Sequence, residues 1–106
     1  MARTEENHGK IIVHIDPMIK DIVPAFLDIR ADDIKAISMA LSREDYDAIR
    51  VIGHSMKGTG GGYGFDTITD IGNSLERAAK EQDRGRVEAL ADELVSYLQQ
   101  LEIVYE

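Results

Sequence analysis

Glycine dominates one stretch of this chain, which reads Gly53-His54-Ser55-Met56-Lys57-Gly58-Thr59-Gly60-Gly61-Gly62-Tyr63-Gly64. A glycine cluster beside a lysine is typical of a phosphate-binding loop, but it also fits a helix from which side chains have been removed. The loop interpretation fails on spacing, because neither Gly-x-Gly-x-x-Gly nor Gly-x4-Gly-Lys-Ser/Thr occurs in any register. A nucleotide-binding loop would also follow a strand, whereas a helical pattern precedes these glycines. We therefore predict that a helix runs into the glycine cluster.

The helix before the glycines has one apolar face. Its apolar stripe consists of Ile49, Ile52, Met56, Thr59 and Tyr63. At about 100° per residue, His54 falls about 180° from the centre of this stripe. The same outer face carries Arg50, Val51, Lys57, Gly58 and Gly61. This placement predicts an exposed histidine and argues against a histidine that is buried in the core.

Glycines inside a helix lower its stability. Four of them fall at the end of this one: Gly58, Gly60, Gly61 and Gly62. Together they would cost about 3–4 kcal/mol relative to alanine, against about 5–15 kcal/mol for the whole stability of a small domain. A residue four positions after His54 covers the same face one turn later, so Gly58 leaves the imidazole accessible to a bulky group and to a second protein. Gly61 extends this clearance, whereas access explains neither Gly60 nor Gly62.

Three further segments have helical periodicity. Apolar residues recur at three- and four-residue steps from Pro24 to Leu41, from Phe65 or Asp66 to Ala79, and from Val87 to Tyr105. The expected inward residues of these three helices are Phe26, Leu27, Ile34, Ile37, Ala40, Leu41, Ile68, Ile71, Leu75, Ala78, Ala79, Val87, Leu90, Ala91, Leu94, Leu98, Leu101 and Tyr105. Short polar or glycine-containing breaks separate the helices. An all-α fold, an antiparallel four-helix bundle, is the architecture that this pattern predicts.

The N-terminal part of the chain has a different composition. Residues 11–15 are rich in β-branched side chains and resemble a strand, but we find no second strand to pair with them. We therefore expect a short extra N-terminal helix or extended segment that lies on the helical body. Asp16-Pro17 predicts the start of a helix, and Pro24 predicts a bend or a restart. The expected division is a polar and extended segment over residues 1–15 and the bundle domain over residues 16–106.

Composition narrows the classes of function. A chain of 106 residues forms one domain, and its net charge of −8 argues against nucleic acid or an anionic membrane as a partner. Without cysteine, disulfides and thiolate metal sites are excluded. No apolar run approaches the length of about 20 residues that spans a bilayer, and no signal sequence is evident, so we expect a cytoplasmic protein. Each helix has a single apolar stripe, which favours a monomer.

At the glycine stretch the sequence resembles the histidine phosphotransfer (HPt) domain family of bacterial phosphorelays. The family signature of His, an apolar residue, Lys-Gly, two small residues and a later apolar-Gly pair is matched by His54, Met56, Lys57-Gly58, Thr59-Gly60 and Tyr63-Gly64. The resemblance covers roughly residues 16–105. It implies that His54 accepts a phosphoryl group, that Lys57 neutralises its charge and that Gly58 leaves room for it.

The resemblance also implies partners. The phosphoryl group would come from an aspartyl phosphate or a sensor histidine kinase and pass to a response-regulator receiver domain. Mg²⁺ would be supplied only by that receiver, so we expect a carrier that holds no metal or other cofactor and is not an enzyme. Met1 and the self-contained set of helices favour a free-standing protein over a piece of a hybrid kinase.

A hydrogen-bond partner for His54 can be sought by helix geometry. If the chain turns near Gly64, His54 lies about 15 Å before the turn, and the residue at the same level on the next helix falls between Asn73 and Glu76. Glu76 flanks the apolar stripe, and the chemotaxis-kinase type of phosphotransfer domain has Glu at this position. A carboxylate there would fix the imidazole tautomer and leave the other nitrogen as nucleophile. The alternative is that Glu76 is one of many solvated charges.

A docking surface and two competing functions complete the interpretation. Arg50, Val51, Lys57 and Gly61 are the expected partner-binding residues around the histidine. One competing hypothesis is a helical protein-interaction module without phosphoryl transfer. The other is a metal-binding or enzymatic bundle that uses His8, His14, Asp16 and His54. The metal hypothesis is weak because no two histidines have i, i+3 or i+4 spacing.

Overall fold

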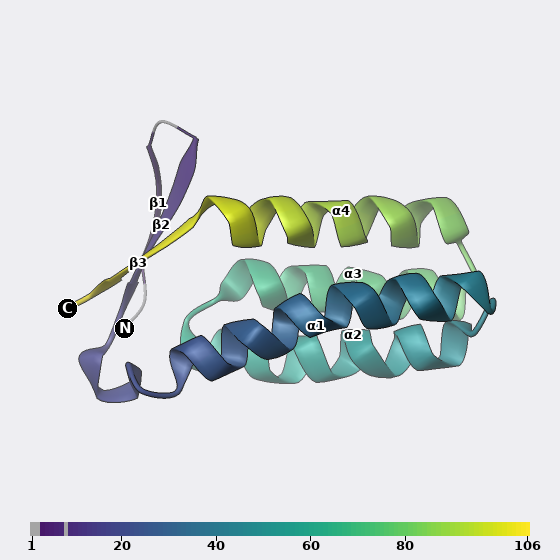
Figure 1. Cartoon of the computed structure of the whole chain (residues 1–106), viewed down its shortest axis with the longest axis horizontal. Coiled ribbons are helices and arrows are strands. Elements are labelled where there is room, and N and C mark those ends of the chain that lie inside the picture. The colour runs from purple at the N-terminus through teal and green to yellow at the C-terminus, as the bar shows by residue number, and fades with distance from the viewer. Residues whose placement is uncertain (1–2, 8) are drawn as a thin grey trace.

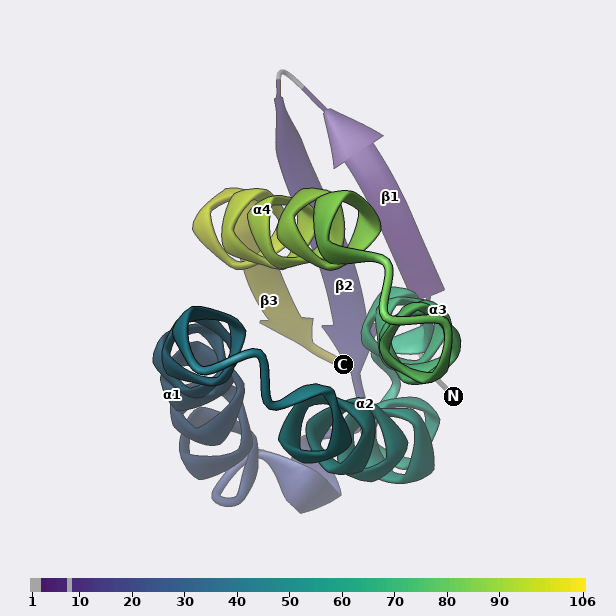
Figure 2. The ribbon, with the colours of Figure 1, turned by 90° about the vertical axis from the view of Figure 1, so that its right-hand side faces the viewer.

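The computed structural model describes residues 3–7 and 9–106 of the chain. This part of the chain is mostly helical and contains four α-helices: α1 (Val23–Ser42), α2 (Tyr46–Gly60), α3 (Asp66–Lys80) and α4 (Arg84–Gln100). The helices lie side by side along the length of the molecule (Figure 1), and the view along them shows a bundle (Figure 2). Their most extensive contact is the one between α2 and α3. The prediction of a bundle with these four helices is confirmed.

Capping side chains mark where two of the four α-helices, α2 and α4, begin. The carboxylates of Asp45 and Asp83 accept hydrogen bonds of 3.1 Å from the backbone N–H groups of Ala48 and Arg86, at the starts of α2 and α4. These bonds satisfy amides that lack a partner inside the first turn. Before α1, Asp16 caps the short 3₁₀ helix η1 (Pro17–Ile19) in the same way. The predicted helix start at Asp16-Pro17 is therefore a single 3₁₀ turn.

The end of α2 is made by glycine. The helix tightens into the 3₁₀ turn η2 (Gly61–Tyr63) and stops at Gly64, which has a φ of 90°. This left-handed conformation is strained for any residue with a Cβ, so glycine is required there. The chain then reverses into α3, and this turn fixes which residues of α3 stand opposite His54.

The core lies between the four helices, as the apolar stripes predicted, and residues 13 and 15 from the N-terminal segment add to it. Its fully buried large side chains are Val13, Ile15, Val23, Ile37, Ile49, Met56, Phe65, Ile68, Ile71, Leu75, Val87 and Leu94. Phe26 packs against the rings of Phe65 and Tyr63, with centroids 5.5 and 4.8 Å away. One expected core position is wrong: Thr59 is exposed, and Gly60 is buried instead.

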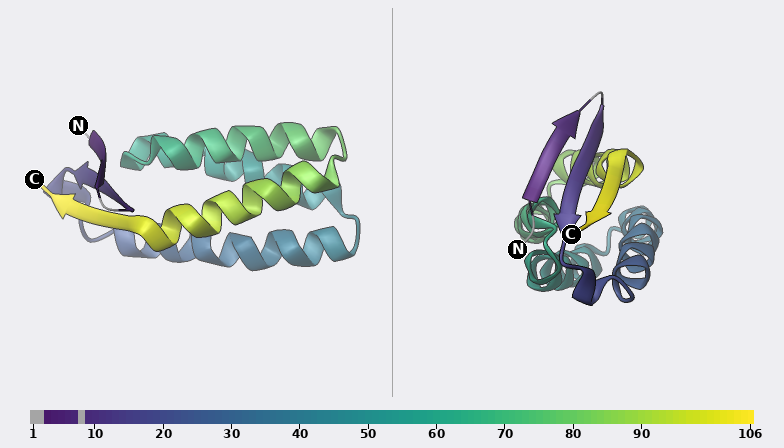
Figure 3. Two further views of the ribbon diagram at one scale, coloured as in Figure 1. Left: turned by 90° about the horizontal axis from the view of Figure 1, so that it is seen from above. Right: turned by 90° about the vertical axis from the view of Figure 1, so that its left-hand side faces the viewer.

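A three-stranded sheet at one end of the bundle (Figure 3) corrects the all-α prediction. Its strands are β1 (Arg3–Asn7), β2 (Lys10–Ile15) and β3 (Leu101–Tyr105), in the order β1-β2-β3. Strand β1 pairs antiparallel with β2, and β3 pairs parallel with β2. The prediction that residues 11–15 have no strand to pair with was therefore wrong, because β1 is too polar to resemble a strand.

The last helix is also shorter than predicted. Leu101 and Tyr105 continue the apolar stripe of α4 at helical spacing, but the helix ends at Gln100 and Leu101 has extended dihedral angles. The β-branched pair Ile103 and Val104 favours a strand, and the register from Ile11↔Leu101 to Ile15↔Tyr105 provides the partner. The expected domain division at residues 15 and 16 stays a prediction.

Candidate functional site

His54 lies on the outer face of α2, at the middle of the helix. Its side chain is 72% exposed, and Val51, one turn earlier on the same face, is 53% exposed. On the opposite face Ile49 and Met56 are fully buried. The predicted division of this helix into a core face and an accessible histidine face is confirmed.

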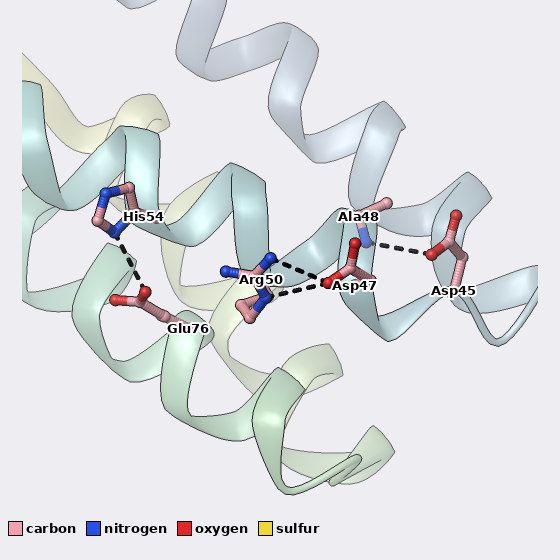
Figure 4. A network of polar contacts seen from close by, with 6 residues as sticks. All are labelled: Asp45, Asp47, Ala48, Arg50, His54 and Glu76. Atoms are coloured by element: carbon pink, nitrogen blue, oxygen red, sulfur yellow. Dashed lines mark hydrogen bonds and ion pairs between the residues drawn. The ribbon is translucent and has the colours of Figure 1, made fainter.

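Glu76 reaches His54 from α3. Nδ1 of the imidazole lies 3.1 Å from Oε2 of Glu76 (Figure 4), and the other ring nitrogen points away from the carboxylate. An ionised carboxylate can only accept a hydrogen bond, so the Nδ1–H donates. In the neutral imidazole the free lone pair is therefore on Nε2, which is the outward nitrogen. Helix geometry had placed a candidate partner at this level of α3, and the structure brings the two side chains together.

Lys57 joins the same carboxylate. Its Nζ lies 3.7 Å from Oε1 of Glu76, and its side chain is half-exposed, one turn after His54 on α2. Partial burial raises the pKa of Glu76, but the hydrogen bond and charge of His54 and the charges of Lys80 and Lys57 outweigh this and lower it. Glu76 is thus held as a carboxylate between an imidazole and an ammonium. Lys80 was missed by the sequence interpretation, although it follows Glu76 by four residues on α3.

The lowered pKa of Glu76 predicts how its contribution depends on pH. A carboxylate with a lower pKa in the folded state stabilises the fold fully above its ordinary value of 4.5, and this contribution is lost as the pH falls through the folded-state pKa. We expect the stability difference between wild type and Glu76→Gln to shrink as the pH falls below about 4.5. Urea unfolding of both proteins from pH 3 to pH 7 measures it. A difference that grows on acidification would contradict the ion pair.

The glycines of the cluster divide into two kinds. A Cβ built on Gly58 or Gly62 meets nothing within 4 Å among the residues that the structure describes beyond its own helix and chain neighbours. A Cβ on Gly60, by contrast, would lie 2.7 Å from Oγ1 and 2.8 Å from the amide of Thr69. Gly60 is therefore needed for packing against α3, which accounts for one of the two glycines that access could not explain. Gly61 has room for a Cβ at ordinary contact distances.

The other expected partner-binding residues lie along the same helix. Arg50 is half-exposed, and its guanidinium makes hydrogen bonds of 3.0 and 3.1 Å to Asp47 (Figure 4). Beyond His54, the exposed Gly61 and Gly62 line a hollow of about 410 Å³ whose other wall includes Ile15 and Asp16. Along α2, Gly58 lies between His54 and this hollow and has no side chain to cover either of them.

The metal hypothesis gains no support from the described ranges, residues 3–7 and 9–106. Within them, no group of three or more His, Cys, Asp or Glu side chains is placed to hold a metal ion. His14 lies in β2 and is 3.2 Å from Oε2 of Glu106, while His8 lies outside the described residues. None of the helices described is long and apolar enough to cross a membrane.

Comparison with known proteins identifies one family. The family model described as "Hpt domain" matches residues 21–103, which include all four helices and both His54 and Glu76. No curated protein and no solved structure matches the chain.

Proposed function

Because this chain belongs to the Hpt domain family of phosphorelay histidine phosphotransfer domains, we propose that it is a phosphoryl carrier. His54 accepts a phosphoryl group and relays it to or from the aspartate of a response-regulator receiver domain, with a sensor histidine kinase upstream. The observation that carries this proposal is the hydrogen bond between Nδ1 of the exposed His54 and Glu76. This bond leaves an accessible Nε2 lone pair in the neutral imidazole, on the outer face of α2.

The geometry suits nucleophilic attack on an aspartyl phosphate. Nε2 of His54 attacks phosphorus, the P–N bond forms as the bond to the aspartyl oxygen breaks, and the aspartate leaves as a carboxylate. The imidazolium that results keeps its Nδ1–H, so its positive charge lies beside the carboxylate of Glu76. The reverse transfer follows the same path. Glu76 therefore stabilises the phosphorylated ring as well as the reactive tautomer.

Lys57 neutralises the new negative charge. Its distance of 3.7 Å to Glu76 is too long for a strong hydrogen bond, so the ammonium is available to move toward a phosphoryl group on His54. The chain contributes a nucleophile and its charge environment, and the receiver contributes Mg²⁺ and the acceptor aspartate. On this proposal the protein is a carrier and not an enzyme, and it needs no cofactor of its own.

The receiver would dock on the face around His54. Val51 supplies exposed apolar surface, Arg50 and Lys57 supply positive charge, and the exposed Gly58 and Gly61 add no side chain. An apolar centre with a charged rim is what transient interfaces have. We propose a monomer in which the four helices meet in antiparallel order and present this face on one side.

A phosphotransfer assay tests the proposal. The purified protein is mixed with receiver domains that carry a radioactive aspartyl phosphate, and labelled protein is treated with acid and with alkali. We expect an acid-labile, alkali-stable label of about one phosphoryl group per chain, because phosphohistidine has this stability and aspartyl phosphate does not. A protein that binds receivers but never becomes labelled would instead be the helical interaction module.

Gly58 provides a prediction that separates access from stability. Gly58→Leu adds a side chain one turn beyond His54, where the fold has open space. Because leucine favours helix over glycine by roughly 0.5–1 kcal/mol, the midpoint of thermal unfolding should stay or rise. Transfer from a receiver should nevertheless fall by roughly 100-fold, since a partner displaced by even about 1 Å loses that much rate. Gly58→Ala, which adds one methyl group, should lie between. Wild-type transfer in the leucine variant would show that clearance is not the role of Gly58.

A further inference from the structure

The backbones of α2 and α3 come into close contact where Gly53 and Gly72 face each other. A Cβ on Gly72 would lie 2.5 Å from the amide nitrogen of Lys57 and 2.7 Å from the carbonyl oxygen of Gly53. A Cβ on Gly53 would lie 2.7 Å from the amide nitrogen of Glu76 and 2.8 Å from the carbonyl oxygen of Gly72. Both glycines are buried, and the clashing atoms are backbone, which cannot rotate away. Neither position therefore accepts a side chain without separating the two helices.

The atoms that meet at this crossing belong to the site. Gly53 directly precedes His54, and the amide that its missing Cβ would strike is that of Glu76. Gly72 stands one turn before Glu76, and the amide that its missing Cβ would strike is that of Lys57. The spacing of the two backbones at the glycine pair therefore sets how far the Glu76 side chain has to reach toward His54.

We propose that Gly53 and Gly72 are positioning residues for His54. By letting α2 and α3 approach to backbone contact, they bring the Glu76 carboxylate within reach of Nδ1 and of Lys57, and so they select the imidazole tautomer that leaves Nε2 as nucleophile. The inference rests on the proposed function only for the consequence of that tautomer. The hydrogen bond itself can be measured without any phosphoryl transfer.

The required displacement is large compared with the tolerance of the hydrogen bond. Moving a Cβ on Gly72 from 2.5 Å to an ordinary contact of 3.4 Å or more needs a shift of about 1 Å. The Nδ1 to Oε2 distance is 3.1 Å, and a further separation of that size exceeds the range of a hydrogen bond. The Glu76 side chain is only 12% exposed, so packing restricts its alternative rotamers.

Gly60 offers a matched control on the same pair of helices. Its Cβ would clash with Thr69 at 2.7 and 2.8 Å, which is comparable to the clash at Gly53. Gly60 lies seven residues after Gly53, about 10 Å along the helix, at the end of the crossing away from Glu76. Gly60→Ala should therefore destabilise the contact between α2 and α3 as Gly72→Ala does, without moving Glu76 relative to His54.

The test reads the tautomer of His54 by nitrogen-15 NMR of the histidine-labelled protein at pH 8.5, where an ordinary imidazole is neutral. In wild type and Gly60→Ala we expect the Nδ1–H tautomer to predominate. In Gly72→Ala we expect it to fall to the level of Glu76→Ala, and the double variant Gly72→Ala/Glu76→Ala should match Glu76→Ala alone. Such non-additivity shows that the glycine acts through Glu76.

Several results would overturn the inference: a wild-type tautomer in Gly72→Ala, an equal change in Gly60→Ala, or an effect of Gly72→Ala that persists without Glu76.

If Gly72→Ala does not fold, Glu76→Asp keeps both glycines and shortens the carboxylate arm by one methylene group. It should lose the Nδ1–H preference, and retention of that preference would show that helix spacing does not limit the reach. If the NMR spectra are as expected but the protein takes up no phosphoryl label, the proposed function is refuted. The positioning role of the two glycines then still stands.

Discussion

Replacing His54 by glutamine is expected to abolish phosphoryl labelling while leaving the fold intact. His54 is 72% exposed on α2, so the substitution removes little packing. Glutamine also keeps an N–H donor for the Glu76 carboxylate, which prevents that group from losing its main partner. It has no ring nitrogen with a lone pair, so the P–N bond cannot form. Autoradiography after incubation with phosphorylated receiver measures the label, and urea unfolding measures the fold.

His14→Gln is the matched control for this experiment. The His14 imidazole lies in β2, close to Glu106 at the sheet end of the molecule, and its side chain is only 12% exposed. We expect the His14 variant to accept label at the wild-type rate. Label that persists in His54→Gln would place the acceptor elsewhere in the chain and would refute the proposed function.

The site was largely predictable because it lies on one strongly periodic helix. The apolar stripe of α2 set which side His54 faces, and the rise per residue set which part of α3 stands opposite. Both inferences need only local geometry and the position of one turn. The same reasoning did not predict the role of Gly53 and Gly72. Each position needs glycine because a side chain there would clash with the backbone of the other helix. A glycine at an inward position in both facing helices was the available signal.

The sequence did not predict the sheet, for a different reason. The pairing of β2 with β3 joins residues 11–15 to residues 101–105, across almost the whole chain. Residues 101–105 also fit the stripe of α4, so periodicity alone favoured the helix. The β-branched pair Ile103 and Val104 is a local signal for a strand, but it does not outweigh the helical stripe. The partner strand decides between the two, and it lies too far along the chain to be inferred from local sequence.

The sequence interpretation also missed a buried arginine, which contributes to the packing of α1. Arg30 on α1 is 4% exposed; its Nε lies 2.9 Å from Oδ2 of Asp33, and its Nη1 donates a 3.1 Å hydrogen bond to Oγ1 of Thr59 on α2. The guanidinium also lies 5.2 Å from the centre of the Phe26 ring. The pKa of Asp33 lies above its ordinary value, because burial and the charge of Asp32 raise it more than the charge of Arg30 lowers it. Arg30 follows Phe26 by four residues, so it lies on the same, inward face of α1. Its charge would normally favour an exposed position.

Replacing Arg30 by alanine is therefore expected to cause a large loss of stability. It leaves the mostly buried Asp33 without its cation and Thr59 without its donor, and breaking a buried pair costs about 3–5 kcal/mol, against about 5–15 kcal/mol for a whole domain. The loss should shrink at acidic pH, because the unpaired Asp33 becomes neutral as its carboxylate takes up a proton. Urea unfolding at pH 7 and pH 4 measures both effects. Arg50→Ala is the control, since the Arg50–Asp47 pair is exposed and should contribute no more than about 0.5 kcal/mol. If the two alanine variants cost the same, the buried Arg30–Asp33 pair within α1 and the Arg30–Thr59 hydrogen bond between α1 and α2 do not stabilise the fold as expected.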